Sequence, residues 1–586
     1  MTETNARAET APERSVGLIR LGTGLLQGLC LYGLIQASEG KTWPFTDQPL
    51  FAALFLVVLF APAPILASIG RMRLPSLLGW TAIAALLLAA FGFYDAWRQP
   101  TMPEPGKDWE PERAVFAAVG LFVAHVLIAA ADADRRRIGR YETIFALATK
   151  FAVQLGLSFA FVGVLWILLF VGASLFEVIG LKGFKETIGE AWFAAPVSAV
   201  TFAAAVHLTD VRSGLIGAIR TLGLTLLSWL TPIMTAIAAA FLVALPFTGL
   251  EPLWNTGSAT AMLLVAAAAL AVLVNAVYQD GEGDEARPAV LRWSARAAAV
   301  LLVPIVGLAI YGLMLRIGQH GLSPDRIVAG AIAAVAAVLA AGYAFAAVRP
   351  GEWMKPVGLT NVAAACVGLV LLASLFSPIA DPARLSVNSQ MARLERGEIT
   401  PDEFDYAFLR FDGGRWGAAA LQRLKASNNA AIAEHATSAL KAEYRRPSHR
   451  APDMVRADPA RFKIAPAGRA LPREFIALDV PVGSTVANCA ELVGCTAIIA
   501  DLNQDGSEEV IVSQGSRGEI YGKASTGSWS RLGALEAACE GSSADILPKA
   551  VALSPPAFPD VQIGEHRFRV VPDRSYCLAT PPAPTP

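Results

Sequence analysis

Long apolar stretches dominate the first two thirds of the chain, and this pattern stops near Pro378, where a polar tail begins. Apolar runs of roughly 18 to 25 residues are long enough to cross about 30 Å of hydrocarbon as a helix. Windows of about 19 residues place such helices near 16–37, 50–69, 76–97, 114–131, 151–176, 192–208, 219–246, 259–277, 295–315, 326–347 and 357–378. The pattern predicts an α-helical polytopic membrane protein with about 11 transmembrane helices and a C-terminal soluble α+β region. Pro232 in the seventh stretch leaves open a break or a re-entrant piece, which would change the count.

Basic residues in the short loops predict how this membrane domain is oriented. The loops after even-numbered stretches hold about thirteen Lys and Arg residues and those after odd-numbered stretches about eight, and the cytoplasmic side carries the excess. Residues 1–15 are therefore predicted to be cytoplasmic. An odd number of spans then places the tail outside the inner membrane, in a periplasm or its equivalent.

Composition agrees with a membrane protein and excludes one class of partner. Hydrophobic residues make up 54% of the chain and charged residues only 17%, against about 25% charged in a typical soluble domain. The formal net charge is -1, whereas a nucleic-acid-binding protein gathers Lys and Arg on one face. We expect the lipid bilayer as a partner, and no nucleic acid.

The cysteines give an independent indication of the compartment of the tail. Two lie inside predicted spans, and the other four lie in the tail: Cys489, Cys495, Cys539 and Cys577. An even number of cysteines confined to one region is typical of disulfides formed in an oxidising compartment. We expect Cys489 to pair with Cys495, its neighbour in sequence, which leaves Cys539 with Cys577. The alternative is four free thiols in a cytoplasmic domain; CxxC spacing, typical of a zinc site, is absent.

A few polar side chains fall within the predicted spans, where ionisable groups are expensive and are functional candidates by default. They are Arg20, Asp95, His125, Lys150, His207 and Arg296, with the uncharged Gln27, Gln154 and Asn275. Four of the charged residues lie near span ends, where a side chain can reach the interface. His125 and His207 are candidates either for a hydrogen bond between helices or for a site.

The stretch LPFTGLEPLWNTGSAT, residues 245–260, interrupts the helical pattern with two prolines and two glycines. Glu251 and Asn255 are four residues apart and would share one face of a short helix at the periplasmic surface. We expect either a re-entrant or capped loop with these two residues as candidate site residues, or an ordinary tight turn that caps the next span.

Four segments carry a resemblance to a known family: LPFTGLEPLW, NAVYQDG at 275–281, RLSVNSQMARLERG at 384–397 and DYAFLRFDGGRWG at 405–417. They resemble the bacterial inner-membrane proteins grouped as domain of unknown function 4153. The resemblance implies a polytopic membrane protein. It implies no catalytic or ligand-binding residue, because the family is itself uncharacterised.

The tail divides by composition. Residues 379–444 have an amphipathic pattern that predicts short helices, one of them capped by Thr400, and residues 445–473, rich in Pro and Arg, predict a linker. Apolar alternation between Gly and Ser turns predicts a small β-rich domain over 474–580, with a helix near 533–540. The Pro-rich end, 581–586, is expected to be disordered.

One loop of the β-rich domain is a candidate calcium site. Asp501, Asn503, Asp505 and Glu509, with Gly506, form a DxNxDGxxE pattern that runs into the strand EVIVS. Oxygen ligands at positions 1, 3, 5 and 9 with Gly at 6 are how such loops wrap Ca²⁺, although the Glu of an EF-hand at position 12 is missing. The loop resembles the calcium loops of FG-GAP propeller repeats, in a single copy. The alternative is a hairpin turn whose carboxylates accept backbone N–H groups.

No HExxH, Walker, GxSxG or kinase signature occurs, so catalysis has no support in the sequence. We expect a non-enzymatic envelope transport or assembly component, with an envelope protein as partner. One alternative is a membrane enzyme acting on a lipid-linked substrate through Glu251, Asn255 and Lys185 or Glu186. Another is an envelope sensor that signals through a partner.

Overall fold

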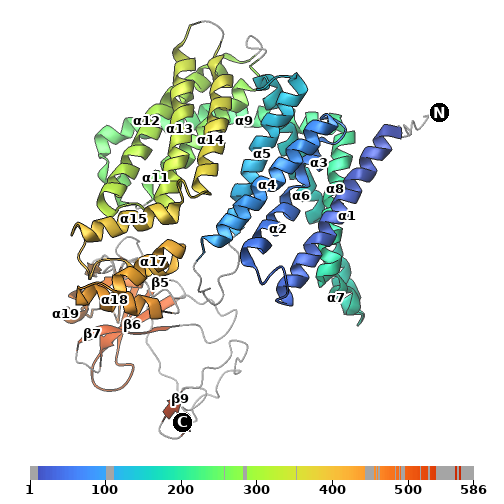
Figure 1. Ribbon diagram of the computed structural model, residues 1–586. Coiled ribbons are helices and arrows are strands. Elements are labelled where there is room, and N and C mark those ends of the chain that lie inside the picture. Colours follow the sequence, from blue (N-terminus) through green and yellow to red (C-terminus); the bar gives the residue numbers. More distant parts are fainter. Residues whose placement is uncertain are drawn as a thin grey trace. The chain divides into compact units, whose positions relative to one another are not determined.

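The computed structural model describes residues 11–99, 111–256, 258–281, 287–350 and 353–442, and shorter stretches of the tail between 454 and 568. Contacts between residues divide the chain into two units, Met1–Arg446 and Pro447–Pro586. The first is helical and the second is built on strands (Figure 1).

Eleven helical segments among the described residues are long and apolar enough to cross a membrane. In chain order they are α1 (Ala11–Glu39), α2 (Gln48–Phe60) with α3 (Ala63–Ser68), α4 (Leu74–Trp97), α5 (Pro111–Asp134), α6 (Tyr141–Val178), α8 (Ala191–Val211), α9 (Ser213–Thr248), α11 (Ala259–Tyr278), α12 (Ala289–His320), α13 (Pro324–Val348) and α14 (Pro356–Leu375). The predicted fold class is confirmed. Helix α9 continues through Pro232, so the break considered there does not occur.

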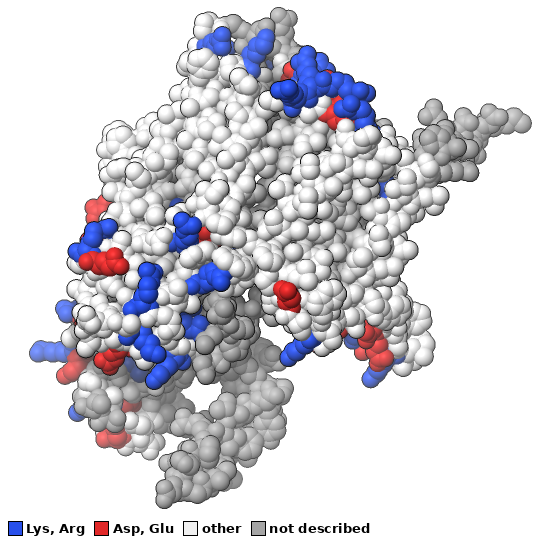
Figure 2. Space-filling model, in the orientation of Figure 1, with Lys and Arg blue, Asp and Glu red and all other residues white. Residues whose placement is uncertain are grey.

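Two of these helices are much longer than a bilayer is thick. Helices α6 and α9 have 38 and 36 residues, or about 57 and 54 Å at 1.5 Å per residue, against about 30 Å of hydrocarbon. Figure 2 shows charged side chains toward the two ends of the helical unit and a broad uncharged band between them. The unit contains a multi-pass membrane domain.

The most deeply buried part of the membrane domain is the packing of α11, α12 and α13. On α12, Ala295, Ala298 and Ala309 have no exposed surface. Small side chains let helices approach closely in a membrane, where burial of apolar surface gives little driving force. Gly342 on α13 illustrates the approach, because a Cβ there would lie 2.2 Å from Thr360 Oγ1 on α14.

Two short helices lie between membrane helices. Helix α7 (Gly183–Gly189) precedes α8, and α10 (Glu251–Asn255) lies in the predicted interruption between α9 and α11. Trp254 of α10 packs against Tyr311 of α12 with ring centroids 5.9 Å apart, and Gly312 leaves the space for its ring, since a Cβ there would lie 2.5 Å from it.

Four further helices follow the last membrane helix within the same unit: α15 (Pro382–Glu395), α16 (Tyr406–Phe411), α17 (Gly414–Lys425) and α18 (Ala430–Lys441). They share a core in which Leu409, Ala420, Leu421 and Ala436 have no exposed surface. The predicted cap at Thr400 is wrong. Its hydroxyl donates to Glu403, the chain continues as turns, and Asp405 caps α16 by accepting from Phe408 N.

The second unit holds a five-stranded sheet in the order β2-β4-β5-β6-β7. Strand β2 (Phe462–Ala465) pairs in parallel with β4 (Cys495–Ala500), while β5 (Glu509–Gln514), β6 (Arg517–Lys523) and β7 (Trp529–Leu535) follow as an antiparallel meander. The shorter elements are β1 (Met454–Arg456), α19 (Arg473–Ile476), β3 (Asp479–Pro481), β8 (Val561–Ile563) and β9 (His566–Phe568). The helix predicted near 533–540 begins in strand β7, and residues 536–540 lie outside the described part.

Candidate functional site

The strongest concentration of charge among the described membrane helices is centred on Asp210, near the end of α8. Its Oδ2 accepts from Arg20 Nη2 of α1 at 2.8 Å. Its Oδ1 accepts from Lys150 Nζ of α6 at 2.8 Å and from Arg71 Nη2, in the turn before α4, at 2.5 Å. Three cations therefore meet one carboxylate, which leaves two positive charges in excess.

Burial makes this group unusual. Arg20 is 1% exposed, Asp210 12% and Lys150 14%, whereas Arg71 is 43% exposed. A charge removed from water is stabilised only by an opposite charge in direct contact. Asp210 therefore holds Arg20, Lys150 and Arg71 in place. Since the four residues come from four segments, Asp210 joins α1, α6 and α8 with the turn before α4, at the end of the bundle nearest the N-terminus.

Glycines allow α1 to approach α8 closely. A Cβ at Gly24 would lie 2.7 Å from that of Ala203, and one at Gly28 would lie 2.4 Å from Pro196 Cα. These two glycines form a GxxxG pair, the spacing that brings membrane helices together. About one turn before Gly24, at four residues' distance, Arg20 meets Asp210.

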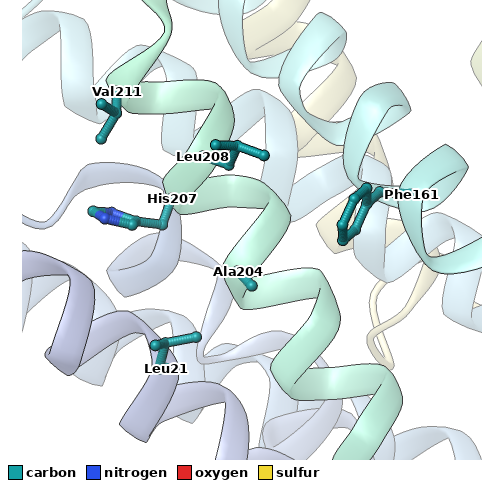
Figure 3. A pocket seen from close by; sticks show the side chains of 6 residues that line it. All are labelled: Leu21, Phe161, Ala204, His207, Leu208 and Val211. Carbon is teal, nitrogen blue, oxygen red and sulfur yellow. The ribbon is translucent and has the colours of Figure 1, made fainter. Parts of the chain in front are cut away.

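His207 lies one turn before Asp210, and its Nδ1 is 3.4 Å from Arg20 Nη1. An arginine only donates, so Nδ1 accepts and the ring hydrogen is on Nε2. Beside this ring is a hollow of about 280 Å³ lined by Leu21, Phe161, Ala204, His207, Leu208 and Val211. Figure 3 shows that α8 provides four of these side chains, α1 provides Leu21 and α6 provides Phe161.

A second polar group joins α6, α11, α13 and α14. Asn275 Nδ2 donates to Tyr343 Oη at 2.6 Å, Tyr343 donates to Asn361 Oδ1 at 2.5 Å, and Asn361 Nδ2 donates to Asn275 Oδ1 at 2.6 Å. Tyr141 adds bonds to Asn275 and Asn361 at 3.3 and 3.2 Å. The ring of donors and acceptors is closed, as expected for a polar network that fastens helices.

His125 is buried between three helices with both ring nitrogens in use. Trp80 Nε1 donates to its Nδ1 at 3.1 Å, and its Nε2 is 2.9 Å from Ser68 Oγ. The indole can only donate, so Nδ1 accepts and Nε2 carries the hydrogen toward Ser68. This geometry favours the hydrogen-bonding alternative over a site.

Glu251 and Asn255 bound the short helix α10, and Glu251 is exposed. The side chain of Asn255 lies outside the described part. Lys185, considered as a partner of Glu251 in an enzyme, donates to Glu177 at 2.8 Å, and Glu186 is exposed on α7. The three residues whose side chains are described, Glu251, Lys185 and Glu186, show no contact that would gather them into one site.

The helices after the membrane domain are attached to it through Asp381. This carboxylate has no exposed surface, caps α15 by accepting from Arg384 N at 3.0 Å, and accepts from Tyr94 Oη at 3.1 Å and from Arg98 Nη1 at 3.3 Å. Gln390 of α15 donates to the carbonyl of His320 at 2.9 Å. Arg98 follows the third span and His320 ends the ninth, so these ends share one face with the end of the eleventh. That agrees with the even number of crossings between them, six from the third span to the ninth and two from the ninth to the eleventh.

The tail contains the expected short-range disulfide. Cys489 and Cys495 are bonded, with their Cα atoms 5.7 Å apart. Cys539 and Cys577 lie outside the described residues, so their pairing stays a prediction. Cys30 and Cys366, in membrane helices, are free thiols.

The candidate calcium loop directs its acidic oxygens at its own backbone. Asp501 accepts from Asp505 N at 3.2 Å and Gly506 N at 2.9 Å, and Glu509 accepts from Leu502 N at 2.7 Å. The hydrogen bond from Ser507 N is the main cause that lowers the pKa of Asp505. Across the described residues, no group of three or more His, Cys, Asp or Glu side chains is placed to hold a metal ion. This favours the hairpin turn, and calcium binding by Asp501, Asn503, Asp505 and Glu509 stays a prediction.

Sequence reasoning missed the centres of both polar groups. Asp210 stands beside Arg212 at a span end and has the pattern of an ordinary interfacial residue. Tyr343 and Asn361 lie within predicted spans, as Asn275 does, and the same criterion of a polar side chain inside a span could have found them.

Comparison with curated proteins and with solved structures found no match. The model of one family, described as a domain of unknown function, DUF4153, matches residues 29–425. That range is more than half of the chain; it includes most of the membrane domain and α15 to α17, and it ends before the strand-containing unit. The chain belongs to the DUF4153 family.

Proposed function

We propose that the protein is a non-enzymatic component of envelope assembly in the bacterial inner membrane, with a cytoplasmic N-terminus and a periplasmic tail that binds an envelope protein. The observation that carries the proposal is the Cys489–Cys495 disulfide, because structural disulfides form and persist in oxidising compartments. The excess of basic residues in the even-numbered loops supports the same orientation.

The closed hydrogen-bond ring of Asn275, Tyr343 and Asn361 supports assembly rather than transport. A transporter presents polar groups to a substrate at the midplane, at broken helices. Here these groups are used to bind one another. The exposed Glu251 and the Lys185–Glu177 pair likewise support a non-enzymatic protein over an enzyme on a lipid-linked substrate.

Accessibility of two introduced cysteines tests the orientation. Asn428→Cys lies between α17 and α18, and Arg136→Cys lies between α5 and α6; both positions are exposed. Each is placed in a chain with Cys30 and Cys366 replaced by Ala, and that parent sets the background. A membrane-impermeant maleimide should label Asn428→Cys once the outer membrane is open and Arg136→Cys only after the inner membrane is opened. The reverse pattern would refute the proposal.

A partner of the tail is tested by crosslinking in cells. A photoreactive residue at position 428 should yield a discrete adduct with an envelope protein, and one at position 136 should not yield the same adduct. If neither position gives an adduct, or both give the same one, the assembly role is contradicted.

A further inference from the structure

The charged group at Asp210 is not neutral by itself. Arg20, Arg71 and Lys150 surround one carboxylate, and Arg20 Nε is buried without a hydrogen-bond partner among the described atoms. An excess of two positive charges at the end of a helix bundle, in surroundings of low dielectric constant, favours an additional anion strongly. An anion can bind the group through Arg71. This side chain is 43% exposed and uses only one guanidinium nitrogen on Asp210.

The hollow next to the Asp210 group is lined by apolar side chains and by the imidazole ring of His207. Leu21, Phe161, Leu208 and Val211 are each between 36% and 51% exposed, on the outer face of helices that cross the membrane. His207 lines the hollow and meets Arg20. The hollow and the cationic group therefore meet at the His207 ring.

We propose that an anionic phospholipid binds at this place, in the leaflet nearest the N-terminus. Its phosphate takes the exposed side of Arg71 and the excess charge around Asp210, and part of an acyl chain lies in the hollow between α1 and α6 over α8. Basic pockets between membrane helices are how proteins hold anionic head groups. A soluble anion would use the charges but would leave the hollow unused.

Two variants separate the charge from the hollow. Arg71→Gln removes one cation and leaves Arg20 and Lys150 on Asp210. Ala204→Phe fills the hollow and changes no charge. Arg73→Gln is the matched control, because Arg73 lies two residues away, is 50% exposed and pairs with Asp132 instead.

The measurement is binding of phosphatidylglycerol, phosphatidylethanolamine and inorganic phosphate to the purified full chain, by native mass spectrometry and by the shift of the unfolding temperature. The wild-type chain and Arg73→Gln should prefer phosphatidylglycerol. Arg71→Gln should lose about fivefold in affinity, the amount expected for one basic residue near an anionic head group, and Ala204→Phe should lose at least as much.

A loss in either folded variant, with Arg73→Gln unchanged, supports the proposal even if the other variant does not fold. Equal binding of the two lipids by the wild-type chain would overturn it. A preference that survives in both variants would place the lipid elsewhere, and an equal effect of inorganic phosphate would show that the group binds a soluble anion.

Discussion

Arg20 and Asp210 are 190 residues apart in the chain, and their side chains meet at 2.8 Å with Arg20 almost completely buried. The contact fixes the register of α1 on α8 at the end where α6 and the turn at Arg71 also converge. A buried charge pair adds little net stability, but removing one partner leaves the other uncompensated.

Asp210→Asn should therefore destabilise the membrane domain strongly. The substitution keeps the size of the side chain and removes the only negative charge of the group described above, so the free energy of unfolding should fall by about 3–5 kcal/mol. Unfolding by denaturant in mild detergent measures it. Glu177→Gln is the control, because its pair with Lys185 is exposed on both sides and should contribute less than about 1 kcal/mol. Equal losses in the two variants would show that the Asp210 group is not structural.

Tyr343→Phe tests the polar ring between α11, α13 and α14. The hydroxyl accepts from Asn275 and donates to Asn361, so its removal should cost about 1–2 kcal/mol of unfolding free energy. Tyr311→Phe, on the half-exposed ring of α12, should change the value by less than about 0.5 kcal/mol. If Tyr343→Phe is as stable as the wild-type chain, the ring does not fasten the helices.

The Asp210 group and the polar ring around Tyr343 show which parts of the structure the sequence could predict and which it could not. The length of each apolar run depends on the thickness of the bilayer, which is why the eleven helices and the end of the membrane domain near Pro378 were predictable. The pairing of Arg20 with Asp210 depends on which faces of α1 and α8 pack together. A local sequence pattern does not specify those faces. The same holds for Asp381, which has the sequence pattern of a simple N-cap before Pro382 but is also a buried partner of Arg98.

Asp381→Ala should loosen α15 from the membrane helices. The variant loses the cap of α15, about 1 kcal/mol, together with the bonds to Tyr94 and Arg98. Limited proteolysis of the purified chain should cut within 379–400 at least several times faster than in the wild type. Asp405→Ala loses a comparable cap on α16, at 2.8 Å from Phe408 N, without a contact to the membrane helices. Cleavage at 379–400 that is equally fast in both variants would contradict the role of Asp381 as the attachment point.

Tyr521 should make the stability of the strand-containing unit fall at alkaline pH. Burial is the largest cause that raises the pKa of its hydroxyl, and the hydrogen bond to Glu519 at 2.8 Å adds to it. The folded state favours the neutral form, so the stabilisation is complete below the ordinary pKa of about 10 and is lost as the pH rises above that value, where the unfolded chain ionises first. Urea unfolding of the full chain, followed by proteolysis within 495–535, should show the decline, and Tyr521→Phe should lessen it. An identical decline in the variant would exclude Tyr521 as its source.

The native cysteines test the proposed location of the tail outside the cytoplasm most directly. Cells with an opened outer membrane and an intact inner membrane are treated with an impermeant thiol reagent, with and without reductant, and the peptides that contain Cys489 and Cys495 are quantified by mass spectrometry. We predict that both residues are labelled only after reduction, while the inner membrane stays intact. Labelling without reductant that requires the inner membrane to be opened would contradict the account and place the tail in the cytoplasm.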